Sequence, residues 1–228
     1  MRGRVGLRRL AVLVGALLAL LALWWTDPTP TTLSQYVTSL QERTPSQLHN
    51  IRRAAQSLDG VYIMPAARSR EQAEVIFSFN QVVGPRSLER GYVPAPVFMV
   101  AETLDSVGGG ICQVSSSLYN AALLAGLEVV ERHPHYRQVE SVPPGLDATV
   151  WYGLADLKLR NPFPWPVRLR VQIRGQNLIV SVLGRGSRHS LRIPPIRVEG
   201  HRLDPQHLQV SVYRGNERLS QDRYVVAP

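Results

Sequence analysis

The chain is short of cysteine and of lysine, and it lacks the patterns of several protein classes. One of its 228 residues is a cysteine, Cys112, and one is a lysine, Lys158. A single cysteine excludes an intrachain disulfide. The sequence has no internal repeat and no low-complexity tract, and no basic stripe is interleaved with aromatic residues. A disordered or fibrous protein is therefore not indicated, and the 44% hydrophobic content is enough for one sizeable core.

Positive charge is unevenly placed along the chain. Four of the 26 basic residues (Arg2, Arg4, Arg8 and Arg9) precede the first apolar run, so the rest carries 22 basic and 17 acidic residues. This moderate excess suits contact with anionic wall polymers or lipid head groups. It is too diffuse to indicate a nucleic-acid partner.

The N-terminus has the pattern of a secretory signal or signal anchor. An uninterrupted apolar run from Leu10 to Trp25 follows the arginines. Ala22, Leu23 and Trp24 lack the small residues that usually precede a cleavage site. We therefore predict a retained transmembrane segment over residues 1–26. The chain would be a single-pass protein of the cell membrane, with its C-terminal part extracytoplasmic.

The remaining chain divides by composition. Residues 27–44 are rich in proline, threonine and serine, which predicts a spacer. The main domain is predicted over residues 45–184, with a β extension over 185–228. Thr44 and Pro45 are a good N-cap and first residue for an amphipathic helix that Gly60 ends.

The fold class predicted is α+β. Alternation of apolar and charged residues from Val167 to Arg174, followed by a turn and Leu178 to Leu183, predicts a β-hairpin. Further short apolar runs around 191–198, 208–213 and 223–226 predict a β-rich C-terminal half. We expect a mainly antiparallel sheet, with a central helix packed on it that begins after a glycine-rich turn.

That turn carries the single cysteine. Gly108, Gly109 and Gly110 precede Cys112 and Gln113, and a helical apolar stripe then runs to Gly126. A helix N-terminus stabilises a thiolate, and a glycine turn lets the backbone approach a ligand. We therefore predict Cys112 as a nucleophile, with the glycines and Gln113 binding substrate. A buried structural thiol is the alternative.

A thiolate nucleophile needs a base, and the candidates are His133 and His135. A third polar group would orient the imidazole, and Asp147 and Asp156 are both candidates. No cofactor is predicted, and no metal site, because the spacing of these residues matches no standard zinc pattern.

Two further residues are candidates for substrate binding. Arg86 follows a Gly-Pro turn and could pair with a substrate carboxylate, although a surface salt bridge is the commoner role for an arginine. Tyr92 is either a core or a cleft aromatic residue.

Together these stretches resemble the VanW-like family, named after an accessory protein of some vancomycin-resistance clusters. The resemblance covers roughly Ser46 to Gly184. The matching stretches are Phe77 to Asn80, Val83 to Arg86, Gly108 to Asn120, Leu123 to Glu128, Glu131 to His135, and Val142 to Val150. A collinear series of this length is far more specific than a short motif.

The resemblance implies a function in the cell envelope. For some family members it implies L,D-transpeptidase activity, in which a cysteine is acylated by a peptidoglycan peptide stem and passes it to an amine. The expected partners are therefore peptide stems or their precursors, together with the membrane through the N-terminal helix. A non-catalytic module that binds cell wall or precursor is the alternative. Oligomeric state is not indicated.

Overall fold

A computed structural model describes residues 30–66, 75–98 and 103–226. The predicted signal anchor lies outside these residues. Within them, no helix is both long and apolar enough to span a membrane. Residues 31–228 form one compact unit.

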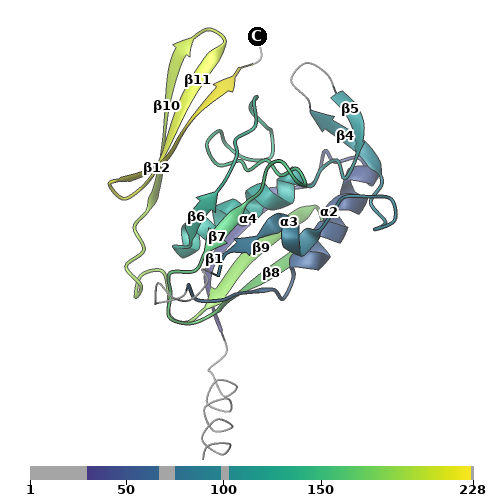
Figure 1. Cartoon of the computed structure of the whole chain (residues 1–228). Helices are drawn as coiled ribbons and strands as arrows, with labels where there is room; N and C mark the ends of the chain where they lie inside the picture. Colours follow the sequence, from purple (N-terminus) through teal and green to yellow (C-terminus); the bar gives the residue numbers. More distant parts are fainter. Residues whose placement is uncertain (1–29, 67–74, 99–102, 227–228) are drawn as a thin grey trace, which may run out of the picture. The chain divides into compact units, whose positions relative to one another are not determined.

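The unit is α+β, as predicted (Figure 1). Its helices are α2 (Pro45–Leu58), α3 (Phe79–Val83) and α4 (Cys112–Ala125). The strands of the first half are β1 (Thr31–Ser39), β2 (Tyr62–Ile63), β3 (Phe77–Ser78), β4 (Pro94–Phe98), β5 (Thr103–Val107) and β6 (Glu128–Glu131). Those of the second half are β7 (Lys158–Arg160), β8 (Val167–Arg174), β9 (Asn177–Gly184), β10 (Ile196–Asp204), β11 (His207–Arg214) and β12 (Glu217–Val225).

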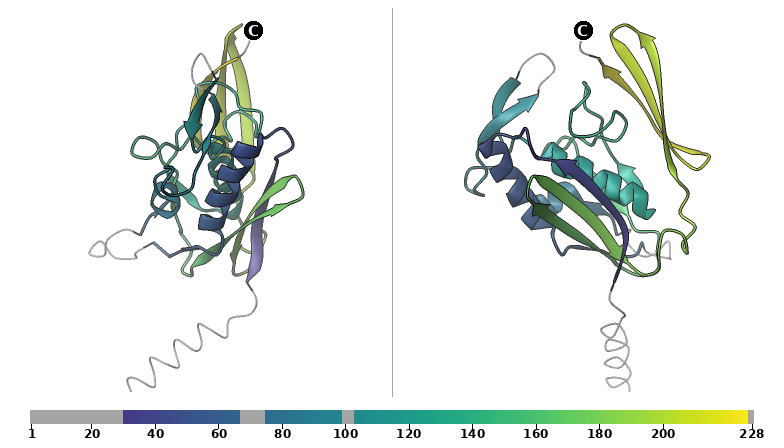
Figure 2. Two further views of the ribbon diagram at one scale, coloured as in Figure 1. Left: turned by 90° about the vertical axis from the view of Figure 1, so that its right-hand side faces the viewer. Right: turned by 180° about the vertical axis from the view of Figure 1, so that it is seen from behind.

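The main sheet is antiparallel and has the order β1-β9-β8-β2. Helices α2 and α4 cover one of its faces, as the view from behind shows (Figure 2). The predicted hairpin is confirmed as β8 and β9, and Val167, Leu169 and Val171 are buried against the helices. Burial of these apolar side chains on one face of the sheet is what fixes its register.

Both long helices begin and end near where the sequence predicts. Thr44 accepts a hydrogen bond from the backbone of Gln47, whose side chain accepts one in return from the Thr44 N–H, so α2 has a capping box. Gly126 ends α4 in the left-handed conformation at φ +83°. Helix α4 is buried almost all round, which makes it the centre of the core.

Half of the segment predicted as a spacer is a strand of the main sheet. Thr31 to Ser39 form strand β1, which pairs with β9 along its whole length. The inward residues of β1 include Ser34 and Thr38, and their hydroxyls bond to Ala121 O and to Ser117 Oγ of α4 at 2.6 and 2.9 Å. These polar contacts explain why the segment does not look like a buried strand.

Three smaller sheets complete the unit. Strands β3, β7 and β6 form one, the β4-β5 hairpin forms another, and β10, β11 and β12 form the third. Strand β3 is short, since Phe79 already begins α3 and Ser78 caps that helix. The three C-terminal strands lie within the region predicted as a β extension.

Candidate active site

Cys112 is the first residue of α4, directly after the glycine turn. Gly108 and Gly110 have φ of +92° and +96°, which favour glycine. A Cβ on Gly109 would lie 2.3 Å from the carbonyl oxygen of Ala95 in β4. The three glycines are therefore demanded by backbone geometry and close packing, and the turn holds the start of α4 in place.

The thiol lies beside an imidazole. Burial by itself would raise the pKa of Cys112, but the hydrogen bond and charge of His135 lower it more, so the pKa is below its usual value. Burial would likewise lower the pKa of His135, yet its interactions with Asp147 and Cys112 raise it to about 9. Both shifts favour a thiolate–imidazolium pair over the neutral thiol and imidazole, and the positive end of α4 adds to this.

Asp147 orients the imidazole. Its Oδ2 lies 2.6 Å from His135 Nδ1 and also accepts the His135 backbone N–H at 2.6 Å. Burial would raise the pKa of this carboxyl, but the contacts with His135 and Arg132 lower it. Cys112, His135 and Asp147 therefore form a chain of thiol, imidazole and carboxylate, the arrangement of cysteine nucleophiles with an oriented base.

A buried network holds Asp147 in turn. Its Oδ1 accepts hydrogen bonds from Arg132 Nη2 at 2.8 Å and from the Tyr224 hydroxyl at 2.6 Å. Arg132 also pairs with Asp222 of β12, and its guanidinium lies 5.3 Å from the ring centroid of Tyr119 in α4. The sequence reasoning singled out neither Arg132 nor Tyr224 as part of the site.

The thiol opens into a cleft of about 580 Å³. Its lining includes the glycine turn, Arg86, the loop from Pro134 to Ser141, and Thr149 to Tyr152. Two buried polar atoms of cleft residues, Arg86 Nη2 and Thr149 Oγ1, have no hydrogen-bond partner among the described residues. They are available to a ligand.

The backbone N–H of Cys112 is also available. It donates to no acceptor within residues 30–66, 75–98 and 103–226, as expected of a first-turn helical N–H. Burial lowers the pKa of Arg86, against the charge of Cys112 nearby, which raises it. A helix N–H and a guanidinium beside a thiolate can stabilise an oxyanion or a carboxylate.

The structure separates the candidate residues that the sequence left open. His133 pairs with Glu131 at 3.0 Å, is half exposed and does not line the cleft. Asp156 bonds the Ser78 hydroxyl at 2.5 Å and the Asn80 N–H at 2.9 Å, so it caps α3 and does not touch either histidine. Of these candidates, His135 is the histidine next to the thiol, and Asp147 is the carboxylate that bonds it.

Some of the predicted substrate-binding residues line the cleft, and others do not. Gly108, Gly110, Gln113 and Arg86 line the cleft, whereas Gly109 does not. The Gln113 amide is already engaged, since it bonds Thr38 Oγ1, the Ser39 carbonyl and Arg43 at 3.1, 2.7 and 2.7 Å. Gln113 therefore ties α4 to the end of β1.

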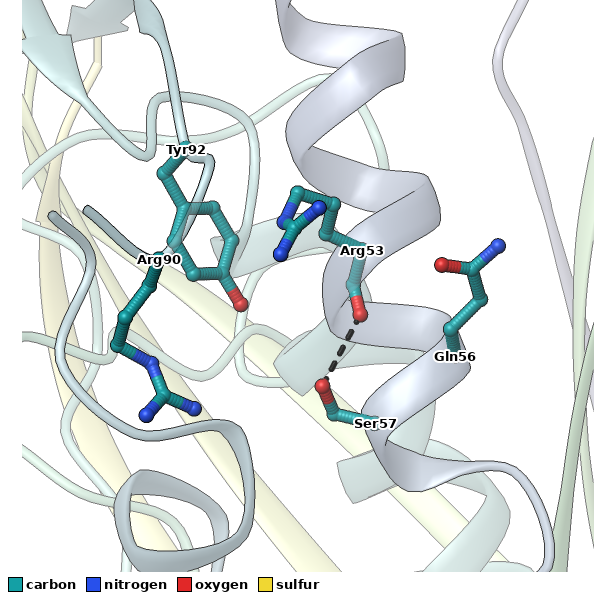
Figure 3. A pocket seen from close by; sticks show the side chains of 5 residues that line it. All are labelled: Arg53, Gln56, Ser57, Arg90 and Tyr92. Atoms are coloured by element: carbon teal, nitrogen blue, oxygen red, sulfur yellow. Dashed lines mark hydrogen bonds between the residues drawn. The ribbon is translucent and has the colours of Figure 1, made fainter. Parts of the chain in front are cut away.

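Tyr92 lies away from the thiol, in a second hollow of about 440 Å³ (Figure 3). Its ring is buried, and Arg53 of α2 lies over it at 5.6 Å from the ring centroid. Among the described residues, no group of three side chains of the types that bind metal ions comes together.

The fold and site define an α+β protein with a Cys–His–Asp chain, whose cysteine begins the central helix and lines a cleft together with the histidine. A sequence model described as VanW-like protein matches residues 46–183, and the chain belongs to this family. It is 41% identical over 150 residues to the uncharacterized protein YoaR of Bacillus subtilis (strain 168), covering 66% of this chain and 47% of YoaR.

A second relative is the vancomycin B-type resistance protein VanW of Enterococcus faecalis (strain ATCC 700802 / V583). The identity is 26% over 142 residues, which cover 60% of this chain and 49% of that protein. The matches therefore span about half the length of each relative. No solved structure matches the chain.

Proposed function

We propose that this protein is a cysteine acyltransferase of the L,D-transpeptidase type that acts on the peptide stems of peptidoglycan. The observation that carries the proposal is the Cys112–His135–Asp147 chain, which opens into a cleft at a helix N-terminus. Such a chain supplies a nucleophile, a proton carrier and a group that orients it.

In the first step the Cys112 thiolate attacks the carbonyl carbon of a stem amide bond. The tetrahedral oxyanion accepts a hydrogen bond from the Cys112 N–H. The C–N bond then breaks, the leaving amine takes the proton of the His135 imidazolium, and a thioester remains on Cys112. In the second step, an amine of a neighbouring stem attacks the thioester and gives its proton to His135. The thiolate leaves as the new amide forms, and with water as acceptor the same steps release the acid.

The cleft suits a peptide with a carboxylate. Arg86 Nη2 is buried in it without a hydrogen-bond partner in the described part of the chain. A carboxylate of the stem would satisfy this donor and stay near, but apart from, the thiolate. Trp151 and Tyr152 also line the cleft, are half exposed and offer apolar surface to the rest of the stem.

The proposed place of action is outside the cytoplasmic membrane, with the N-terminal segment as anchor. The pattern of residues 1–26 supports this. The Enterococcus relative is named as a vancomycin resistance protein, and the family resemblance implies peptidoglycan as the polymer.

The test is muropeptide cross-linking by the purified full chain, compared with the Cys112→Ala and His133→Ala variants. We expect cross-linked products from the parent protein and from His133→Ala, whose histidine lies outside the cleft, and none from Cys112→Ala. A Cys112→Ala protein that still forms cross-links would refute the proposal. So would a parent protein that binds peptidoglycan but yields neither product nor thioester, since it would then be a wall-binding module.

A further inference from the structure

The C-terminal sheet is hydrogen-bonded to the loop that carries His135. The Val225 N–H of β12 donates to the Tyr136 carbonyl at 3.0 Å, directly after the imidazole. A Cβ on Gly145 would lie 2.7 Å from Val210 of β11, so the loop packs closely on this sheet. The loop that delivers the base therefore lies between α4 and a sheet that begins after the end of the family match at residue 183.

Tyr224 of β12 makes the most direct link. It is fully buried, and its hydroxyl donates to Asp147 Oδ1 at 2.6 Å. The phenol oxygen of Tyr224 in turn accepts the Gly145 N–H at 2.8 Å and an Arg132 N–H at 3.0 Å. Burial and the nearby Asp147 carboxylate raise the pKa of Tyr224, so the phenol keeps the proton that it donates.

Arg132 extends the link, because its two terminal nitrogens bond Asp147 and Asp222 of β12. The Asp147 carboxylate belongs to the site, and the Asp222 carboxylate belongs to the C-terminal sheet. Breaking such a buried pair leaves an uncompensated charge, so the two parts of the chain are coupled.

We propose that the C-terminal sheet is part of the active site, with Tyr224 as a positioning residue that holds Asp147 against His135. The proposal gives this sheet a role in the function proposed above and so rests on it. Without the phenol, the Asp147 carboxylate can rotate off His135 Nδ1, and the imidazolium that stabilises the thiolate loses its partner.

The experiment measures the rate of Cys112 alkylation by iodoacetamide against pH in the full chain, for the parent, Tyr224→Phe and Tyr213→Phe. Cys112 is the only thiol, so the rate reports its thiolate fraction. Tyr213 lies in β11 of the same sheet, and the ring contact that it makes within the described residues is with Arg197, 4.3 Å from its centroid, rather than with Asp147 or Arg132. Thermal unfolding of each variant shows whether it is folded at the assay temperature.

The alkylation rate rises with pH as the Cys112 thiolate forms. We expect this rise to shift in Tyr224→Phe by about one pH unit or more toward the ordinary thiol range, while Tyr213→Phe keeps the parent profile. A folded Tyr224→Phe with the parent profile would overturn the proposal. If Tyr224→Phe is unfolded, Asp222→Asn, which loosens Arg132 from the same side, is tested in its place with the same two outcomes. Alkylation requires no peptide substrate, so this result stands apart from cross-linking, which tests the proposed function.

The hollow around Tyr92 carries a second inference, on different residues. Arg53, Gln56 and Ser57 come from α2, whereas Arg90 and Tyr92 come from the segment before β4 (Figure 3). No carboxylate lines this hollow, and neither arginine has an acidic partner among the described residues. Arg90 bonds the Val83 carbonyl at 3.3 Å with one nitrogen, and its other guanidinium donors have no acceptor in the described part of the chain.

We infer that this hollow binds a phosphate group. Two guanidiniums can donate to several oxygens of one anion, and the neutral side chains of Gln56 and Ser57 add no repulsion. Burial raises the pKa of the Tyr92 phenol, and the nearby charges of Arg86, Arg53 and Arg90 act against it by lowering that pKa. In an envelope, the phosphate would come from a phosphodiester polymer or from a lipid head group.

Calorimetric titration tests this with inorganic phosphate, a glycerol-phosphate oligomer and phosphatidylglycerol vesicles. The full chain is compared with a double variant, Arg53→Gln with Arg90→Gln, and with a control, Arg170→Gln with Arg174→Gln, on the exposed face of β8. We expect at least tenfold weaker phosphate binding in the first double variant and parent affinity in the control. The oligomer and vesicle arms then identify the source. Equal affinity in all three proteins, or no binding of phosphate to the parent, would overturn the inference.

Discussion

Replacing Asp147 by asparagine is the sharpest test of the site electrostatics. The pKa of His135 is raised to about 9 from an ordinary value of 6.5. That difference corresponds to about 3 kcal/mol in favour of the imidazolium. The raising contributions come from Asp147 and Cys112, and the hydrogen bond to Asp147 is the largest of them. We therefore expect Asp147→Asn to lower the pKa of His135 by at least about one unit, or about 1.4 kcal/mol.

The direction of the pH effect on alkylation follows from the pairing of the Cys112 thiolate with the His135 imidazolium. The imidazolium is present below the raised pKa of His135 and is lost as pH rises through about 9. The thiolate forms below the ordinary thiol range, because the pKa of Cys112 is lowered by His135. In the variant the weaker imidazolium stabilises the thiolate less, so the acid limb of alkylation must move to higher pH.

The assay is alkylation of Cys112 against pH, with Asp156→Asn as the matched control. Asp156 is also a buried carboxylate, but it bonds Ser78 and Asn80 and not a histidine. Both variants must be shown to be folded by circular dichroism at the assay temperature. If the Asp147→Asn profile superimposes on that of the parent, Asp147 does not tune the thiol, and the reasoning fails.

Three further predictions concern activity and stability. His135→Ala should reduce cross-linking by about 10²- to 10⁴-fold, the usual contribution of a general acid–base, while an equal loss in His133→Ala would show that the wrong base is assigned. Arg86→Gln should raise KM about tenfold or more for stems with a free carboxylate and leave amidated stems unaffected; equal effects on both would remove its carboxylate role. Gly109→Ala should lower the free energy of unfolding by about 1–3 kcal/mol, because its Cβ would collide with the Ala95 carbonyl. Denaturant titration checks this against Gly200→Ala, whose Cβ would meet Leu208 at an ordinary 3.6 Å, and equal stability of the two variants would contradict it.

Sequence patterns predicted the parts of this protein that local chemistry determines. The helix after the glycine turn and the β8-β9 hairpin follow from periodicity and from turn residues, which act over a few positions. Strand β1 was missed because its inward residues include Ser34 and Thr38, whose hydroxyls bond to α4. A strand that buries hydroxyl groups has no apolar alternation to detect.

The site was predicted only in part for a similar reason. His133 and His135 are two residues apart, and only the contact with Asp147 distinguishes them. Tyr224 is 77 residues from Asp147 along the chain, and no local pattern signals such a contact. Arg132 adjoins His133 and so offered a weak signal, which would have required knowing that Asp147 folds back onto the same loop.

The close packing of Gly109 against β4 also determines which residues of the cleft can adjust to different ligands. A Cβ on Gly109 would lie only 2.3 Å from the Ala95 oxygen. The backbone just before α4 is therefore too closely packed to move toward β4. In the proposed reaction the Cys112 N–H would already be in place for the oxyanion before the substrate binds. Its alignment would then cost no reorganisation free energy. If peptide stems are the substrates, as proposed, accommodation of unlike stems would fall to Trp151 and Tyr152, whose half-exposed side chains can change rotamer while the thiol stays in place.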